Sequence, residues 1–77
     1  MSKLLIVDAA TFEKLLLKLG FTIVRQKGSH VFYRHPDGRY TTLPHHKGQD
    51  LGRPLLRAII RQVNLTVDAF NDLIERK

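Results

Sequence analysis

The stretch that decides the fold is FTIVRQKGSHVFYRHPDGRYTTLP, residues 21–44. In its first part Phe21, Ile23, Arg25 and Lys27 alternate with Thr22, Val24 and Gln26, and this β-branched composition favours a strand over a helix. Gly28 and Ser29 then interrupt the pattern, and residues 31–33 resume it. The sequence therefore predicts a two-stranded hairpin that turns near Gly28.

A second turn follows at Pro36, Asp37 and Gly38, because proline presets one backbone angle, aspartate favours local side-chain bonds and glycine accepts positive φ. Residues 40–43 then predict a third strand, which Pro44 ends. Three strands in sequence should form an antiparallel sheet.

Helical patterns flank these strands. Asp8 can cap a helix that runs to about Leu19, where Gly20 supplies a left-handed stop. After a polar loop at residues 45–52, Pro54 suits the first turn of a second helix over residues 53–63, and Thr66 can cap a short last helix. The expected apolar faces contain Phe12, Leu15, Leu16 and Leu19, then Leu56, Ile59, Ile60 and Val63, then Val67, Phe70, Leu73 and Ile74. We expect a single α+β domain over residues 1–77, with the helices on one face of the sheet.

The amino-acid composition restricts the compartment and the classes of partner that we expect for this chain. The chain has 77 residues, no cysteine and a formal net charge of +6. Stability must come from packing, caps or a partner, which fits a reducing cytoplasm. Nucleic acid is the first partner to expect, and acidic proteins and anionic membrane surfaces are the alternatives. The apolar runs are too short to cross a membrane, and we identify no targeting signal.

His30 is the first candidate for chemistry, because it follows Gly28 and Ser29 within a basic stretch that includes Arg25, Lys27 and Arg34. Imidazole titrates near neutrality, so this residue could move protons while the cations stabilise a phosphate. RNA cleavage through the ribose 2′-hydroxyl needs such a group and no metal. Ser29 could bond a phosphate or the turn. The alternative is a hairpin corner whose histidine only ends a strand.

Arg53, Arg57 and Arg61 recur every fourth residue and so share one stripe of the second helix. Such a row favours a phosphate backbone, although basic residues on a helix are as often a solvated surface.

The remaining histidines and the aromatic residues give weaker indications of function. His45 and His46 offer no familiar metal spacing, and we expect them to be solvated loop residues, with no metal or cofactor bound. Exposed aromatic rings can stack unpaired bases. For Tyr33 and Tyr40, packing with an exposed hydroxyl is the stronger expectation.

The order of several motifs resembles one known family. These motifs are Gly20-Phe21, Lys27-Gly28-Ser29-His30, His35-Pro36-Asp37-Gly38-Arg39, Leu43-Pro44 with a nearby histidine, and a Leu-Leu-Arg-x-Ile-Ile-Arg helix. They resemble the HicA toxins over about residues 8–63. The resemblance implies a fold like the double-stranded-RNA-binding domain and an mRNA interferase that arrests translation, with His30 as the catalytic group and Gly28 and Ser29 matching its motif.

The same resemblance implies a HicB antitoxin bound over the toxin, and we expect it to bury the sheet near Lys27 and His30. The chain departs from the family in having Arg53 and Pro54 before the second helix, where a threonine or serine is common. A non-catalytic RNA-binding module remains the alternative, because a basic domain can hold RNA by shape and phosphate contacts alone.

Overall fold

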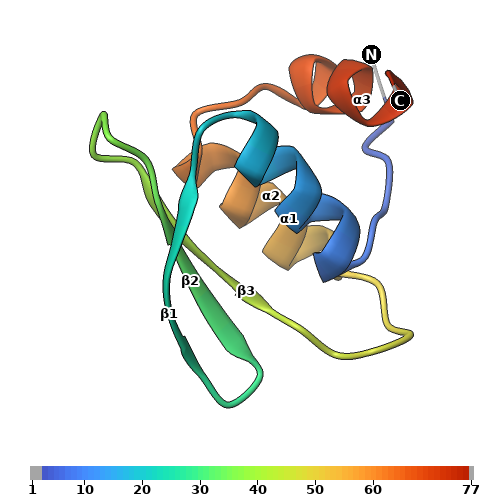
Figure 1. Ribbon diagram of the computed structural model, residues 1–77. Coiled ribbons are helices and arrows are strands. Elements are labelled where there is room, and N and C mark those ends of the chain that lie inside the picture. The colour runs from blue at the N-terminus through green and yellow to red at the C-terminus, as the bar shows by residue number, and fades with distance from the viewer. Residues whose placement is uncertain (1–2, 77) are drawn as a thin grey trace.

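The predicted order of elements is confirmed. The computed structural model describes residues 3–76 and has an α+β fold (Figure 1). Its elements are α1 (Ala9–Lys18), β1 (Thr22–Lys27), β2 (His30–Arg34), β3 (Tyr40–Pro44), α2 (Arg53–Gln62) and α3 (Val67–Glu75).

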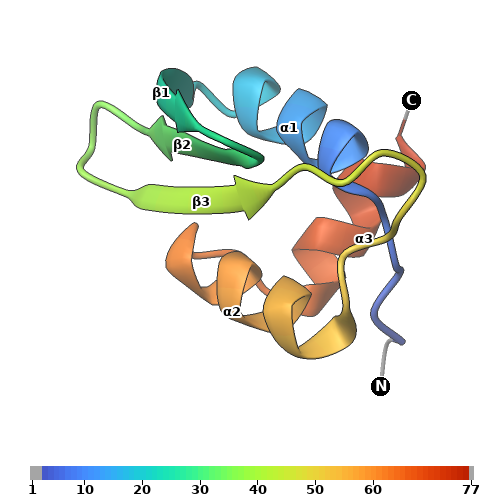
Figure 2. The same ribbon diagram turned by 90° about the horizontal axis from the view of Figure 1, so that it is seen from below.

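The strands form an antiparallel sheet in the order β1-β2-β3. Its two faces differ sharply, because Val31, Tyr33, Thr41 and Leu43 are buried while their neighbours along β2 and β3 are exposed or half-buried. We call the buried side the inner face. Figures 1 and 2 show α1 and α2 on this side, so the sheet's outer face is left open. We define that outer face by Arg25, Lys27, His30, Phe32, Arg34, Tyr40, Thr42 and Pro44.

The predicted helix caps are present. Asp8 Oδ1 accepts a hydrogen bond from the Thr11 amide at 2.9 Å, and Thr66 Oγ1 accepts one from the Ala69 amide at 3.0 Å. Each satisfies a backbone N–H that has no partner within its own helix. Gly20 follows α1 with φ of 101°, as expected for a left-handed stop.

The turn between β2 and β3 holds the ends of two helices. His35 Nε2 lies 3.0 Å from the Leu19 carbonyl oxygen at the end of α1. Arg39 Nη1 donates to the Val63 carbonyl oxygen at the end of α2, over 2.6 Å. Asp37 fixes Arg39 by accepting from its amide and from its Nε. The turn therefore satisfies terminal carbonyls of both α1 and α2.

The segment before α1 is tied to the end of the chain. Asn71 on α3 accepts from the Leu5 amide at 3.0 Å and donates to the Lys3 carbonyl oxygen at 2.7 Å. Phe70 packs on Phe12 with their ring centroids 5.3 Å apart. This contact joins α3 to the core beneath α1. Within residues 3–76, every helix falls short of the length and apolar character needed to cross a membrane.

Candidate functional site

His30 is the first residue of the central strand, and it is exposed on the outer face. It pairs with Lys27 on β1 and with Pro44 on β3. No side-chain hydrogen bond from residues 3–76 holds its imidazole. Both ring nitrogens are therefore available to a ligand on this face.

Gly28 and Ser29 form the two-residue turn between β1 and β2. Gly28 has φ of 59°, whereas Ser29 has negative φ, the pattern of a type II′ turn. A Cβ at Gly28 would meet no atom within 4 Å, so the backbone alone requires glycine here. The Ser29 carbonyl oxygen accepts from the His45 amide at 2.7 Å. This bond fixes the turn, and with it His30, to the chain that follows β3.

A β-bulge sets which residues of β1 join His30. Strict alternation would place Arg25 and Lys27 on the same face as Phe21 and Ile23. Instead Ile23 pairs with Tyr33 and Arg25 pairs with Phe32, so that Val24 is an extra residue in the strand. The bulge reverses the direction of the side chains that follow it. Arg25 and Lys27 therefore lie on the outer face with His30.

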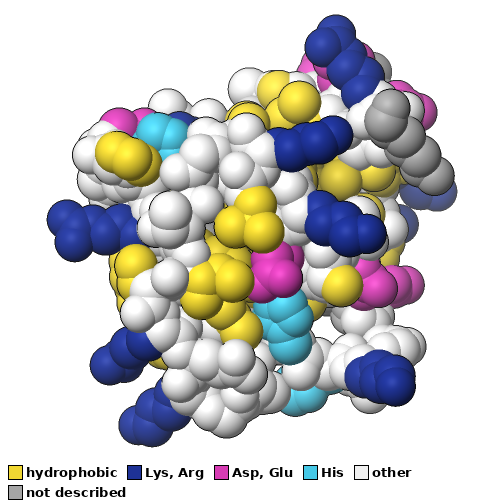
Figure 3. Space-filling view, viewed as in Figure 1, with side chains coloured by type: hydrophobic (Ala, Val, Ile, Leu, Met, Phe, Trp, Pro, Cys, Tyr) yellow, Lys and Arg dark blue, Asp and Glu magenta, His cyan; other side chains and the backbone are white. Residues whose placement is uncertain are grey.

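The outer face combines positive charge with aromatic rings. The Arg25 guanidinium lies 4.5 Å from the centre of the Phe32 ring, and the Phe32 and Tyr40 ring centres are 6.3 Å apart. Arg34 pairs with Tyr40 at the end of β2 away from His30. None of the three strands contains a carboxylate. Figure 3 shows Lys and Arg side chains projecting along the side of the molecule that carries β1.

The arginine stripe of α2 lies apart from His30. Arg57 and Arg61 line a cleft with Leu65, Thr66 and Val67, where α3 begins. The opposite flank of α2 faces β3 and His30, and it presents Leu55, Ala58, Ile59 and Gln62. The structure thus divides the predicted RNA-binding residues into two surfaces. Arg25, Lys27, Gly28, Ser29 and Arg34 accompany His30 on the sheet, while Arg53, Arg57 and Arg61 are exposed along α2.

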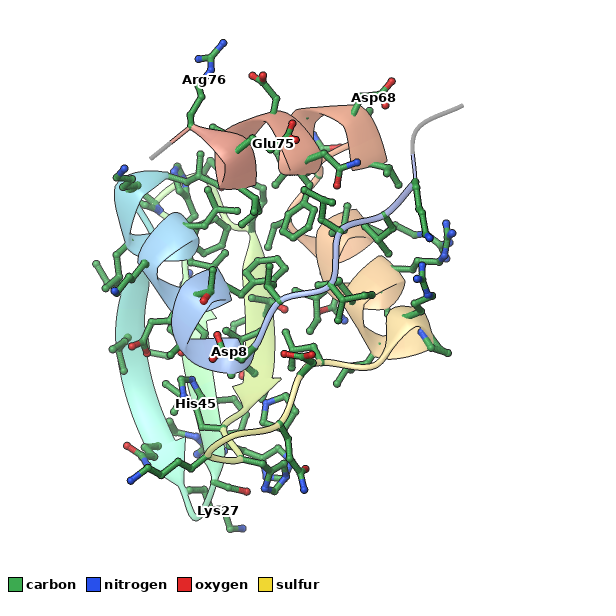
Figure 4. All side chains as sticks on the ribbon, turned by 90° about the vertical axis from the view of Figure 1, so that its right-hand side faces the viewer. Asp8, Lys27, His45, Asp68, Glu75 and Arg76 are labelled. Carbon is green, nitrogen blue, oxygen red and sulfur yellow. The ribbon has the colours of Figure 1, made fainter. Side chains whose placement is uncertain are left out.

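A polar cluster that no sequence motif indicates lies on the inner face, around Tyr33. The Tyr33 hydroxyl donates to Glu13 Oε1 at 2.6 Å and lies 2.8 Å from His45 Nε2. The hydroxyl has a single proton, which it donates to Glu13. It therefore accepts from His45, in the tautomer that carries a hydrogen on Nε2. Figure 4 shows His45 near the start of α1, and Lys27 at the far tip of the hairpin.

This cluster corrects two expectations. Tyr33 is fully buried, so its hydroxyl is bonded rather than exposed, and His45 is a half-buried partner rather than a solvated loop residue. Burial raises the pKa of Tyr33 well above its usual value, and the bond and charge of Glu13 raise it further. The expectations for Tyr40 and His46 agree with their exposure. The partners are 12 and 20 residues from Tyr33, so no local pattern marks them.

The described residues, 3–76, contain no group of three or more His, Asp or Glu side chains placed to hold a metal ion. The cluster around Tyr33 has one carboxylate and one imidazole.

The order of the elements and the open sheet define a small α+β fold with α1 and α2 on one face of the sheet and Arg25, Lys27 and Arg34 on the other. The family model described as the HicA toxin of bacterial toxin–antitoxin systems matches residues 9–65. The chain therefore belongs to the HicA toxin family. No curated protein matches the sequence.

Proposed function

We propose that this protein is an endoribonuclease toxin, an mRNA interferase that cleaves RNA on the outer face of its sheet with His30 as the catalytic group. The observation that carries the proposal is the position of His30. It stands exposed beside Lys27, on a face whose strands contain no carboxylate. Membership of a toxin family gives this position its biological setting.

The reaction that this arrangement fits is an internal transfer at a phosphodiester. A base removes the proton of the ribose 2′-hydroxyl, and the 2′-oxygen attacks the adjacent phosphorus. The bond from phosphorus to the 5′-oxygen breaks, and an acid protonates that oxygen. The products are a 2′,3′-cyclic phosphate and a 5′-hydroxyl end. His30 would serve as the base or the acid in this transfer.

Lys27 and Arg25 would stabilise the charge on the phosphate. Lys27 is the cross-strand neighbour of His30, and the Val24 bulge turns both cations to the same face. Preorganised positive charge is most effective where negative charge develops in the transition state. Ser29 and Gly28 would contribute the turn that presents His30, and Arg34 would hold the RNA chain further along β2.

A HicB antitoxin would neutralise the toxin by covering this same face, near Lys27 and His30. The site of action would be the cytoplasm, where mRNA is found. The stripe of Arg53, Arg57 and Arg61 would then form a second contact to the RNA backbone, separated from the reaction.

Replacing His30 tests the activity. A labelled RNA is incubated in EDTA with the wild type, with His30→Ala and with His46→Ala, which removes an exposed histidine from the loop after β3. We expect wild type and His46→Ala to produce shortened RNA with cyclic phosphate ends, and His30→Ala to leave it intact with an unchanged circular dichroism spectrum. Cleavage by His30→Ala would contradict the assignment. Wild-type protein that shifts RNA on a gel without cutting it would identify a binding module instead.

A further inference from the structure

A cleft runs along the free edge of the sheet, between β3 and α2. Its volume is about 370 Å³, which is large enough for a planar nucleobase. It is lined from the strands by His30, Tyr40, Thr41, Thr42 and Pro44, and from α2 by Leu55, Ala58, Ile59 and Gln62. His30 therefore belongs both to the candidate catalytic face and to this cleft.

The walls of the cleft combine a ring, an apolar surface and an oriented amide. Tyr40 is 48% exposed and Leu55 is 40% exposed, although both are large hydrophobic side chains. The buried Thr41 hydroxyl donates to Gln62 Oε1 at 2.7 Å. This bond fixes the Gln62 side chain and leaves its NH₂ group as a hydrogen-bond donor at the cleft.

The charge around the cleft favours a polyanion. Neither β1, β2, β3 nor α2 contains an aspartate or a glutamate. Arg25 and Lys27 lie on the same sheet face as Tyr40, and Arg34 is the cross-strand neighbour of Tyr40. An acidic or apolar peptide would satisfy only part of this surface, whereas a single RNA strand offers both phosphates and flat bases.

We infer that this cleft binds one unpaired nucleobase of the RNA, stacked on Tyr40 with its edge toward the Gln62 amide, and that it thereby selects single-stranded RNA. The inference rests on the proposed function and names its substrate class. Aromatic rings on a sheet are a common platform for unstacked bases.

The stacked base and the cleaved bond would lie on one short stretch of RNA. Tyr40 pairs with Arg34 and Pro44 pairs with His30, so four residues of β3 separate the two positions. At about 3.3 Å per residue this is roughly 13 Å. The base on Tyr40 and the phosphodiester at His30 would therefore be a few nucleotides apart. A base within a duplex is stacked and paired and could not enter the cleft.

Substitution of Tyr40 provides a direct probe, because the chain has no tryptophan. Tyr40→Trp introduces a single indole whose emission is quenched when a base stacks on it. The ligands are a 2′-O-methyl single strand, which lacks the attacking hydroxyl, and the same sequence as a duplex. We expect quenching by the single strand and little by the duplex. We also expect Tyr40→Phe to bind the single strand normally, and Tyr40→Ala to bind it roughly tenfold more weakly.

Leu17→Ala is the matched control, because Leu17 on α1 is 46% exposed and does not line the cleft. It should bind like the wild type, and thermal melts should show that each variant folds. Gln62→Glu keeps an acceptor for Thr41 and removes the amide donor, so it should also weaken binding.

The proposal fails if Tyr40→Ala binds as tightly as Tyr40→Phe, if the duplex quenches as strongly as the single strand, or if Tyr40→Ala weakens only antitoxin binding. Cleavage by the wild type together with any of these results would leave the nuclease assignment standing. Quenching by the single strand without cleavage would support the cleft and contradict the nuclease.

Discussion

The Tyr33 hydroxyl is the most informative single group to remove, because it joins α1, β2 and the loop after β3. Tyr33→Phe deletes the bond to Glu13 and the bond to His45 while keeping the buried ring. A hydrogen bond to a charged partner contributes about 1.5–3 kcal/mol and a neutral one about 1 kcal/mol. Glu13 and His45 keep roughly a quarter of their side-chain surface exposed, so water partly replaces the lost hydroxyl. We therefore expect a loss of about 2 kcal/mol in the free energy of unfolding.

Urea unfolding, followed by circular dichroism, measures this loss. Tyr40→Phe is the control, because it deletes a hydroxyl from a half-exposed ring and should change stability by less than about 0.5 kcal/mol. For a domain of this size, a loss of about 2 kcal/mol corresponds to a fall in Tm of roughly 8–16 °C. The slope of the free energy of unfolding against urea concentration should be the same for the wild type and the variants. Equal effects of the two substitutions would refute a stabilising role for the cluster.

The same variant has a pH signature. Because the pKa of Tyr33 is raised in the folded protein, the unfolded chain releases this proton first as the pH passes 10. The contribution of Tyr33 to the free energy of unfolding is therefore fully present below pH 10. Above pH 10 this contribution falls, by up to about 1.4 kcal/mol per pH unit. Tyr33→Phe should lack this part of the alkaline decline. Parallel curves for the wild type and the variant above pH 10 would show that the tyrosine ionises equally in both states.

Two further predictions concern the turn between β2 and β3. Arg39→Ala removes the donor to the Val63 carbonyl oxygen and the cation over the Phe21 ring. It should lower the free energy of unfolding, measured in urea, by about 1.5–3 kcal/mol. Arg39→Lys should recover part of this loss. Asp37 accepts from the Arg39 amide, which lowers the pKa of its carboxyl, so its contribution is present above pH 4 and is lost as the pH falls through the folded-state pKa. Asp37→Asn should flatten this acid decline in thermal melts between pH 2 and pH 5, and a decline as steep as that of the wild type would show that another carboxyl causes it.

Local signals in the sequence predict the elements of this fold well. Asp8, Thr66 and Gly20 act through bonds or backbone angles within a few residues, so their roles can be read from neighbouring positions. The strand composition of residues 21–44 and its two turns likewise predict the antiparallel sheet.

Local sequence signals do not determine which residues lie on the outer face. The bulge at Val24 adds one residue to β1, and period-two alternation alone assigns Arg25 to the wrong face. The even spacing of Arg53, Arg57 and Arg61 predicts a stripe correctly, but only the packing of α2 decides that its β3 flank carries Leu55 and Gln62 instead. Sequence spacing defines a surface on one element, and tertiary packing decides which surfaces meet.

The two faces of the sheet are coupled through the hairpin turn. On the inner face Tyr33 holds the His45 side chain, and the His45 amide donates to the Ser29 carbonyl oxygen. Ser29 directly precedes His30, so the turn that leads into His30 is hydrogen-bonded to the loop after β3. The proton transfer proposed for His30 requires its imidazole to be held within a fraction of an ångström of the productive position. The Tyr33 cluster thus helps to hold the turn before His30, while the His30 imidazole makes no side-chain hydrogen bond to residues 3–76.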